Sequence, residues 1–376
     1  MLSLNYSTLT LPKQTLFKRG GLDYLISLPA RKIAIIASKR SHREYHTIDK
    51  ILNNQRRFYA KIFYPCWKGE PSLDDLKKNV AEILDFKPDW IVAIGGGSVI
   101  DGAKLIWALY ENPNIDESRL HIPFSIPKLR KKAKFVAIPT TAGTGSEASS
   151  SAIITNKDNE KKIPIITHDF IPDLAILDPI LIENTPVKII IPTILDAFSH
   201  SIEGFVSVIQ NKIVTNLSYV AVRNIILALK NLSIKKPFAE NALMGGYYGG
   251  IIQNTNLVGP AHALAHNIPE IPHGIATGFF LPHVIKIFSE KNKFICDDFN
   301  ELAHVLGYKN IFEIIKKIYD EFLPKIEIEP KISGYVNLDT EKFDYYSKLA
   351  ENDKLKRFFP DVFDSNDFYR VLTYAY

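Results

Sequence analysis

The first half of the chain carries short apolar runs that alternate with amphipathic stretches. In these runs hydrophobic residues occupy successive positions, which is typical of strands covered on both faces. Helical patterns at 73–84 and 99–110 lie between some of them. This alternation of strand and helix predicts a parallel sheet with right-handed crossovers. The predicted strands are 32–37, 58–63, 90–94, 135–138 and 174–177.

The pattern changes after about residue 185, where almost every segment has helical periodicity. Proline and glycine clusters at 235–237, 258–260 and 269–274 separate these segments. We therefore predict a Rossmann-like α/β domain over residues 1–184 and an all-α domain over residues 185–376, with the site in a cleft between them. The predicted helices are 195–209, 215–231, 239–254, 274–289, 293–306, 310–322, 340–351 and 364–374.

Composition excludes several classes of protein. The 376 residues are 46% hydrophobic and 23% charged, as in ordinary globular proteins. The net charge of +5 is spread along the chain, which argues against a nucleic-acid partner. No stretch approaches the roughly 20 apolar residues of a membrane span, and the N-terminus lacks the order of a signal peptide, so we expect a cytoplasmic protein with no membrane partner. Cys66 and Cys296 fit no metal or redox spacing and are expected to be free, buried thiols, with a single cross-link between them as the alternative.

A glycine-rich turn directly follows a predicted strand. Gly95, Gly96 and Gly97 allow the backbone to turn tightly, and Ser98 is expected to cap the next helix. The N–H groups at such a helix start form an anion site, so this turn is a candidate for binding a cofactor phosphate. The spacing differs from the G-x-G-x-x-G fingerprint, and a purely structural turn is the alternative.

A second polar, glycine-rich segment, 138–147, follows another predicted strand. Open α/β sheets bind their ligands at the carboxyl ends of parallel strands, so two such loops together favour a dinucleotide over two unrelated turns. Glycines 143 and 145 permit close approach of a ligand. The hydroxyls offered to the cofactor are those of Thr140, Thr141, Thr144 and Ser146.

The end of the first predicted strand bears on the choice of cofactor. NAD-binding enzymes often place an acid there for the ribose 2′-hydroxyl. This chain has Ser38, Lys39 and Arg40 instead, and two cations would attract a 2′-phosphate. We therefore expect Ser38 to contact the cofactor and NADP(H) to be preferred over NAD(H); the alternative is that both cations only cap a surface turn.

Histidines and one carboxylate cluster in the second half. Asp196 and His200 are four residues apart, so on a helix they project from one face, and His262 and His266 repeat this spacing. His273 follows shortly after. A carboxylate with imidazoles suits a divalent ion, and this donor set accepts Fe²⁺ or Zn²⁺ alike. The alternative is a group of ordinary surface histidines.

Together these residues resemble the iron-dependent (group III) alcohol dehydrogenase family, whose fold is shared with dehydroquinate synthase. The resemblance covers nearly the whole chain in order, and the loop at 139–147 is its most specific part. The family patterns are matched at 69–72, 95–104, 139–147 and 172–179, and by Asp196 and His200 with Glu203 after them.

The resemblance implies a role for each of the motif residues. It implies that Asp196, His200, His262 and His273 hold the metal and that His266 lies near the nicotinamide as a proton relay. It also implies a homodimer. Three departures are visible: the spacing from His266 to His273 is about three residues shorter, 192–195 replaces small residues, and the acid after the first strand is missing. The cofactor residues implied are Gly96, Gly97, Ser98, Thr140, Thr141, Thr144 and Lys162.

The expected reaction is hydride transfer between a nicotinamide and a small alcohol or aldehyde. A divalent ion with an open position would act as a Lewis acid on the substrate oxygen. His266 would relay the proton to or from water, and Asp101 would help to orient the groups along this relay. One alternative is a lyase or a polyol-phosphate or phosphonate-aldehyde dehydrogenase on the same fold. Another is a non-catalytic metal- or nucleotide-binding protein.

Overall fold

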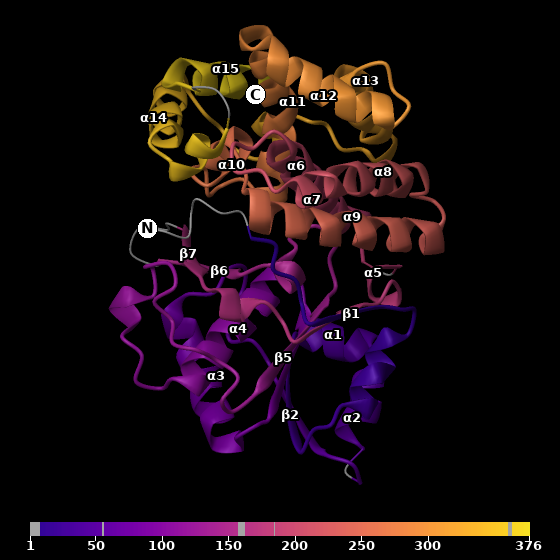
Figure 1. Cartoon of the computed structure of the whole chain (residues 1–376), viewed down its shortest axis with the longest axis vertical. Coiled ribbons are helices and arrows are strands. Elements are labelled where there is room, and N and C mark those ends of the chain that lie inside the picture. The colour runs from indigo at the N-terminus through magenta and orange to yellow at the C-terminus, as the bar shows by residue number, and fades with distance from the viewer. Residues whose placement is uncertain (1–7, 55, 157–161, 184, 360–362) are drawn as a thin grey trace. The chain divides into compact units, whose positions relative to one another are not determined.

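The computed structural model describes residues 8–54, 56–156, 162–183, 185–359 and 363–376 (Figure 1). Its contacts divide the chain into two compact units. Of the described residues, the α/β unit comprises those of Thr10–Thr141 and Gly145–Thr185, and the helical unit comprises residues 8–9, Ala142–Thr144 and those of Pro186–Tyr376. The sequence-based division placed residues 142–144 in the first domain, whereas they pack with the helices.

The α/β unit is built on a parallel sheet of six strands in the order β1-β8-β5-β4-β2-β3. All five predicted strands lie in it. The sixth, β1, escaped the sequence analysis because it has four residues, three of them exposed, on the edge of the sheet. The strands are β1 (Gln14–Phe17), β2 (Lys32–Ala37), β3 (Tyr59–Phe63), β4 (Trp90–Gly95), β5 (Lys134–Pro139) and β8 (Leu174–Leu177).

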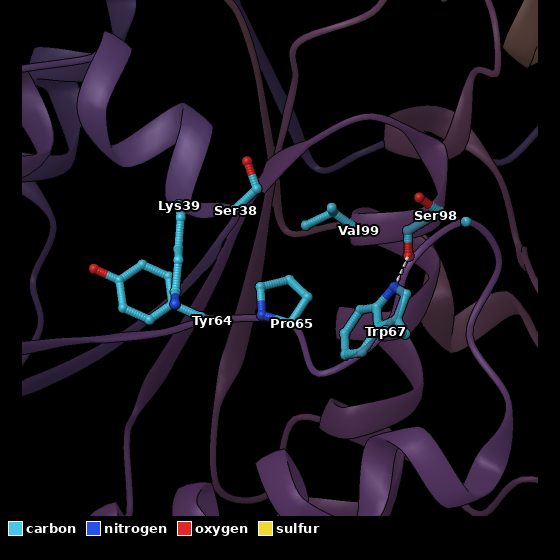
Figure 2. Close-up of a pocket in the computed structure, with 8 residues that line it drawn as sticks. Ser38, Lys39, Tyr64, Pro65, Trp67, Ser98 and Val99 are labelled. Atoms are coloured by element: carbon cyan, nitrogen blue, oxygen red, sulfur yellow. Dashed lines mark hydrogen bonds between the residues drawn. The ribbon is translucent and has the colours of Figure 1, made fainter.

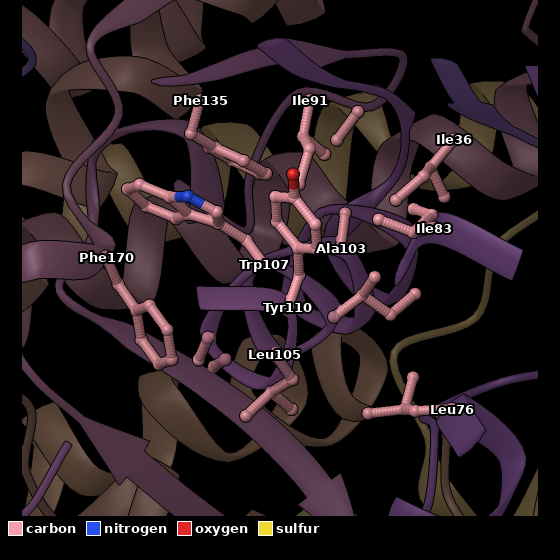
Figure 3. Packing of buried hydrophobic residues seen from close by; sticks show 14 of the residues in the cluster. Ile36, Leu76, Ile83, Ile91, Ala103, Leu105, Trp107, Tyr110, Phe135 and Phe170 are labelled. Atoms are coloured by element: carbon pink, nitrogen blue, oxygen red, sulfur yellow. The ribbon is translucent and has the colours of Figure 1, made fainter. Parts of the chain in front are cut away.

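Both faces of this sheet are buried, which explains the uninterrupted apolar runs. In β2, Ala34 and Ile36 face one core, whereas Ile33 and Ile35 face the other. Figure 3 shows the first core, where the Trp107 ring stacks on Phe135 with centroids 5.2 Å apart. The helices of the unit are α1 (Lys39–Glu44), α2 (Thr47–Leu52), α3 (Leu73–Phe86), α4 (Gly97–Glu111) and α5 (Ile180–Glu183).

A separate antiparallel pair of strands, β6 (Ser151–Thr155) and β7 (Lys162–Ile166), was not predicted. Both strands are five residues long. Buried and partly buried residues alternate in β6, but its sequence does not show this, because hydroxyl residues stand at both of its ends. The strand β7 contains Pro164, which argues against a strand by sequence alone.

The helical unit differs from the sequence prediction at two prolines. The first long helix, α6, begins at residue 187 rather than 195 and has Pro192 inside it, and α9 begins at Lys235 with Pro237 in its first turn, where proline is tolerated. The helix α10 was not predicted. The helices are α6 (Val187–Phe205), α7 (Lys212–Thr215), α8 (Leu217–Lys230), α9 (Lys235–Asn256), α10 (Pro260–Ala265), α11 (His273–Lys291), α12 (Lys293–Val305), α13 (Ile311–Lys316), α14 (Thr340–Glu351) and α15 (Ser365–Ala375).

Two expectations from composition need correction. Within the described residues one helical segment, Lys212–Lys230, is long and apolar enough to cross a membrane by length and composition. This is weak evidence of a span, because α8 packs on α9 and α6 with half of its apolar window buried, as a core helix does. Both cysteines are free, as expected, but neither is buried: Cys66, in the segment between β3 and α3, is exposed, and Cys296, on α12, is partly exposed.

Candidate functional site

One candidate site lies in the α/β unit, at the carboxyl edge of the parallel sheet. The chain leaves β2 towards β3 on one side and returns to β4 on the other, so the strand order reverses between β2 and β4. Ligands of open α/β sheets bind at such a point. A cavity of about 270 Å³ lies here, between the segments that follow β2, β3 and β4 (Figure 2). It is lined by Ser38, Lys39, Tyr64, Pro65, Trp67, Gly69, Ser98 and Val99.

The first turn of α4, directly after the glycine turn, forms one wall of this cavity with Ser98 and Val99, and the cap of this helix differs from the prediction. Gly96, with extended backbone, is the N-cap of α4, and Ser98 lies inside the first turn, because the helix begins at Gly97. A Cβ on Gly95 would lie 2.6 Å from that of Val99, so only glycine fits. The Trp67 indole N–H donates to the Ser98 carbonyl at 3.3 Å and ties the wall together (Figure 2).

The second loop is tied to the first at the sheet edge. The Thr140 N–H donates to the Gly95 carbonyl at 2.9 Å. The Thr141 hydroxyl is buried, has no hydrogen-bond partner among the described residues, and lies beside Gly96. Thr144 is held in the helical unit, where its carbonyl accepts the Gln253 amide at 2.9 Å. The structure thus brings Gly95–Ser98 together with Thr140 and Thr141, whereas Thr144 is anchored to α9.

Polar groups buried behind the two loops hold them in place. The Lys104 ammonium, fully buried, donates to the carbonyls of Ser149 and Ser151, both at 2.8 Å. One Asp101 oxygen accepts the Ile153 N–H at 3.1 Å. Asp101 therefore braces β6, with Ser146 as a further hydrogen-bond partner, and its predicted part in proton transfer stays a prediction. No sequence signal beyond the family pattern pointed to Lys104.

Burial dominates the electrostatics of this cluster. It raises the pKa of Asp101 to about 6 and that of Glu147 to about 7, although Lys104 opposes both shifts. Burial also lowers the pKa of Lys104 to about 8, against the two carboxylates.

Two lysines predicted to bind the cofactor have different surroundings. The Lys162 ammonium pairs with the Glu70 carboxylate at 2.7 Å, and Thr155 donates to the same carboxylate. Lys39 lines the cavity, with its ammonium 5.9 Å from the centre of the Tyr64 ring (Figure 2).

A second candidate site lies inside the helical unit. Asp196 and His200 project from α6, His262 comes from α10, and His273 begins α11. One Asp196 oxygen lies 3.7 Å from Nε2 of His200, 3.5 Å from Nε2 of His262 and 3.7 Å from Nε2 of His273. The structure therefore brings together all four residues predicted as ligands. Three of them, Asp196, His262 and His273, offer ligand atoms within 4.8 Å of one another.

Close packing of α11 on α6 makes this convergence possible. A Cβ on Gly274 would lie 2.2 Å from the Pro192 carbonyl oxygen, and one on Gly278 would lie 2.6 Å from the Leu195 Cβ. Gly274 and Gly278 lie one turn apart on α11. Because neither has a side chain, α11 can approach α6 closely at both positions. As a result His273 reaches Asp196 although the segment after His266 is short.

The cluster is buried on nearly every side. The side chains of Asp196, His200 and His262 are at most 4% exposed, whereas that of His273 is 29% exposed. The His266 ring, at the C-cap of α10, stacks on the His273 ring with centroids 5.4 Å apart. The group is open to solvent at His273, on the side where His266 lies.

The donor atoms fit a divalent cation. Nε2 of His262 is buried, and its 3.5 Å separation from Asp196 is longer than an ordinary hydrogen bond. Burial lowers the pKa of His200 to about 4 against the pull of Asp196. Burial would raise the pKa of Asp196, but the surrounding imidazoles hold it far below its usual range. One carboxylate oxygen facing three imidazole nitrogens is a donor set typical of divalent zinc or iron.

Known proteins match both units. Residues 12–179 match the iron-containing alcohol dehydrogenase model, and residues 190–376 match the model of the C-terminal part of the same family. The chain is 33% identical over 288 residues to the NADPH-dependent butanol dehydrogenase of Clostridium saccharobutylicum, which covers 75% of this chain and 74% of that protein. The chain belongs to the iron-containing alcohol dehydrogenase family.

One further relative and one solved structure show how much of the chain such matches cover. Aldehyde-alcohol dehydrogenase 2 of Entamoeba histolytica is 28% identical over 92% of this chain, which spans only 43% of that longer protein. The structure of an iron-containing alcohol dehydrogenase from Thermococcus thioreducens matches 98% of this chain and 99% of its own, with a TM-score of 0.88 and 24% identity. That match shows the iron-containing alcohol dehydrogenase fold.

Family membership makes the protein an oxidoreductase of the alcohol dehydrogenase type and supports a metal ion and a nicotinamide cofactor. Two further residues support the proposed ligands, and one of them, Thr277, escaped the sequence analysis. Thr277 donates to Asp196 at 3.0 Å, and Glu203, noted only as part of a pattern, contacts His262. Thr277 carries no local sequence signal, because its contact depends on how α11 packs on α6.

Proposed function

We propose that this chain is a metal-dependent alcohol dehydrogenase, or aldehyde reductase, that acts on small alcohols and aldehydes and prefers NADP(H). The convergence of Asp196 with three imidazoles carries the proposal. These four positions are the ligand positions implied by the family pattern, and they come from three separate helices. A chance surface group of histidines would not leave Asp196 and His262 almost fully buried.

The residues of the chain have distinct tasks in this proposal. Asp196, His200, His262 and His273 hold one divalent ion, Fe²⁺ or Zn²⁺. That ion supplies Lewis-acid chemistry at a substrate oxygen, and the nicotinamide supplies or accepts the hydride. His266 lies on the exposed side of the group and exchanges a proton with solvent, because an imidazole can both accept and donate a proton.

The α/β unit binds the cofactor. The amino end of α4 faces the cofactor pyrophosphate, since the first N–H groups of a helix are free to bind an anion. The Thr141 hydroxyl, which has no partner among the described residues, is available beside it. Lys39, at the cavity wall after β2, attracts the 2′-phosphate of NADP(H). The name of the Clostridium relative, an NADPH-dependent enzyme, supports the same preference.

The proposal is tested on purified, metal-loaded protein with a panel of short aldehydes and alcohols. We expect aldehyde-dependent oxidation of NADPH, slower oxidation of NADH, and loss of both on chelation. Lys39→Ala should raise the KM for NADPH about 10-fold and leave the KM for NADH unchanged, since a charged hydrogen bond to phosphate contributes about 1.5–3 kcal/mol. Lys50→Ala, on α2 outside the cavity, is the control. Turnover that persists after complete removal of metal would rule the proposal out.

The proposal also covers the oligomeric state of the protein and its location in the cell. We infer a homodimer in the cytoplasm; light scattering on the purified protein measures the mass, and fractionation of cells measures the location.

A further inference from the structure

Glu203 is a buried carboxylate that the reaction does not use directly. It lies seven residues after Asp196 on α6, on the same helix face, and its side chain is fully buried. One oxygen lies 2.5 Å from Nδ1 of His262, and the other accepts the Ala261 N–H at 2.7 Å. Both oxygens therefore contact α10, the helix that supplies His262.

These contacts determine where the His262 ring carries its proton. An ionised carboxylate only accepts hydrogen bonds, so Nδ1 must be the donor. Nε2 faces Asp196 at 3.5 Å, inside the proposed ligand group, and is the nitrogen that carries the lone pair whenever the ring is neutral, as a metal ligand must be. Fixing the tautomer and ring orientation of a ligating histidine in this way is a general property of carboxylates behind metal sites.

We propose that Glu203 is a positioning residue for the metal centre, which commits His262 to bind the ion through Nε2. This inference rests on the proposed metal site. Glu203 does not contact the ion, and its effect is on metal affinity rather than on a chemical step. Its second bond, to the Ala261 N–H, fixes the start of α10, so the His262 backbone and ring are held by the same side chain.

A purely structural role would anchor α10 and nothing more. Glu203→Gln separates the two roles, because the glutamine oxygen can still accept the Ala261 N–H. Its amide N–H₂ then faces Nδ1 of His262 and favours the opposite tautomer, with the proton on Nε2. The structural anchor survives this substitution, whereas the proposed commitment of Nε2 is lost.

The experiment measures Zn²⁺ affinity of the full chain by competition with a chelator, and the visible spectrum of the Co²⁺ form. Glu203→Gln should weaken Zn²⁺ binding about 10- to 100-fold and change the Co²⁺ spectrum. The matched control is Glu111→Gln, a buried carboxylate that accepts the N–H groups of Lys132 and Ala133 in the α/β unit. The control should bind Zn²⁺ as the wild type does.

The outcomes separate this inference from the proposed function. If the wild type binds no Zn²⁺, the metal site fails and the inference with it. If the wild type and a folded Glu203→Gln bind equally, with identical Co²⁺ spectra, only the role of Glu203 is overturned. Should Glu203→Gln fail to fold, ¹⁵N-histidine NMR of the Zn²⁺-loaded wild type decides: a proton on Nδ1 of His262 supports the inference, and a proton on Nε2 refutes it.

Discussion

The two units build their sites from different materials. In the α/β unit the site is mainly backbone: a glycine turn, a helix start and a threonine loop at one edge of a sheet. In the helical unit it is made of side chains from α6, α10 and α11, which meet because Gly274 and Gly278 allow close packing. A site made of backbone can be found from a local motif, whereas a site made of side chains depends on how distant helices pack.

The largest effect is expected from removing a ligand in the helical unit. His262→Ala should abolish metal binding and lower kcat/KM at least about 1,000-fold, because the ligand set loses a nitrogen and the ion its fixed place. Metal content and steady-state rates measure this. His304→Ala, an exposed histidine on α12, should keep both. Full metal content in His262→Ala would contradict the assignment.

A methyl group at the contact between α6 and α11 tests whether packing sets the ligand geometry. Gly274→Ala places a Cβ 2.2 Å from the Pro192 carbonyl oxygen, so α11 must move and carry His273 away from Asp196. We expect metal affinity to fall about 10- to 100-fold, as when the support of a ligand is removed. Gly334→Ala, where a Cβ meets nothing within 4 Å, is the control. Equal affinity in the two variants would show that close packing is not required.

The corresponding change in the α/β unit should affect the cofactor alone. A Cβ on Gly102 would lie 2.2 Å from the Trp67 ring, which lines the cavity. Gly102→Ala should displace Trp67 and raise the KM for NADPH by about 10-fold, or 1.4 kcal/mol. Metal content should not change. A loss of metal in this variant would refute the division of tasks between the units.

The smallest effect concerns stability against pH. The pKa values of Asp101, about 6, and Glu147, about 7, are raised by burial, so the folded state holds protons that the unfolded state has released. Stability from these groups is present below about pH 4 and is lost as pH rises to about 7. Asp101→Asn should reduce this loss by about 1 kcal/mol, measured as the free energy of unfolding in urea at pH 5 and 7.5. An unchanged pH dependence would contradict the burial argument.

Much of the α/β unit could be predicted from sequence, and less of the helical unit. The apolar runs of β2 and β4 predicted strands because both faces of the sheet are buried. The glycine motif at 95–98 predicted the turn that follows β4, because its residues form that turn themselves. The start of α6 could not be predicted, because Pro192 normally interrupts a helix and here lies inside one. The family resemblance named the four candidate ligands, whereas the roles of Thr277 and Gly274 depend on tertiary packing that no local pattern records.

The most direct test of the account is a crystal structure of the metal-loaded protein, with anomalous scattering at the edge of the bound metal. The account predicts one peak at about 2.0–2.2 Å from a carboxylate oxygen of Asp196 and from ring nitrogens of His200, His262 and His273. A peak bound by other residues, or none between these four side chains, would contradict it.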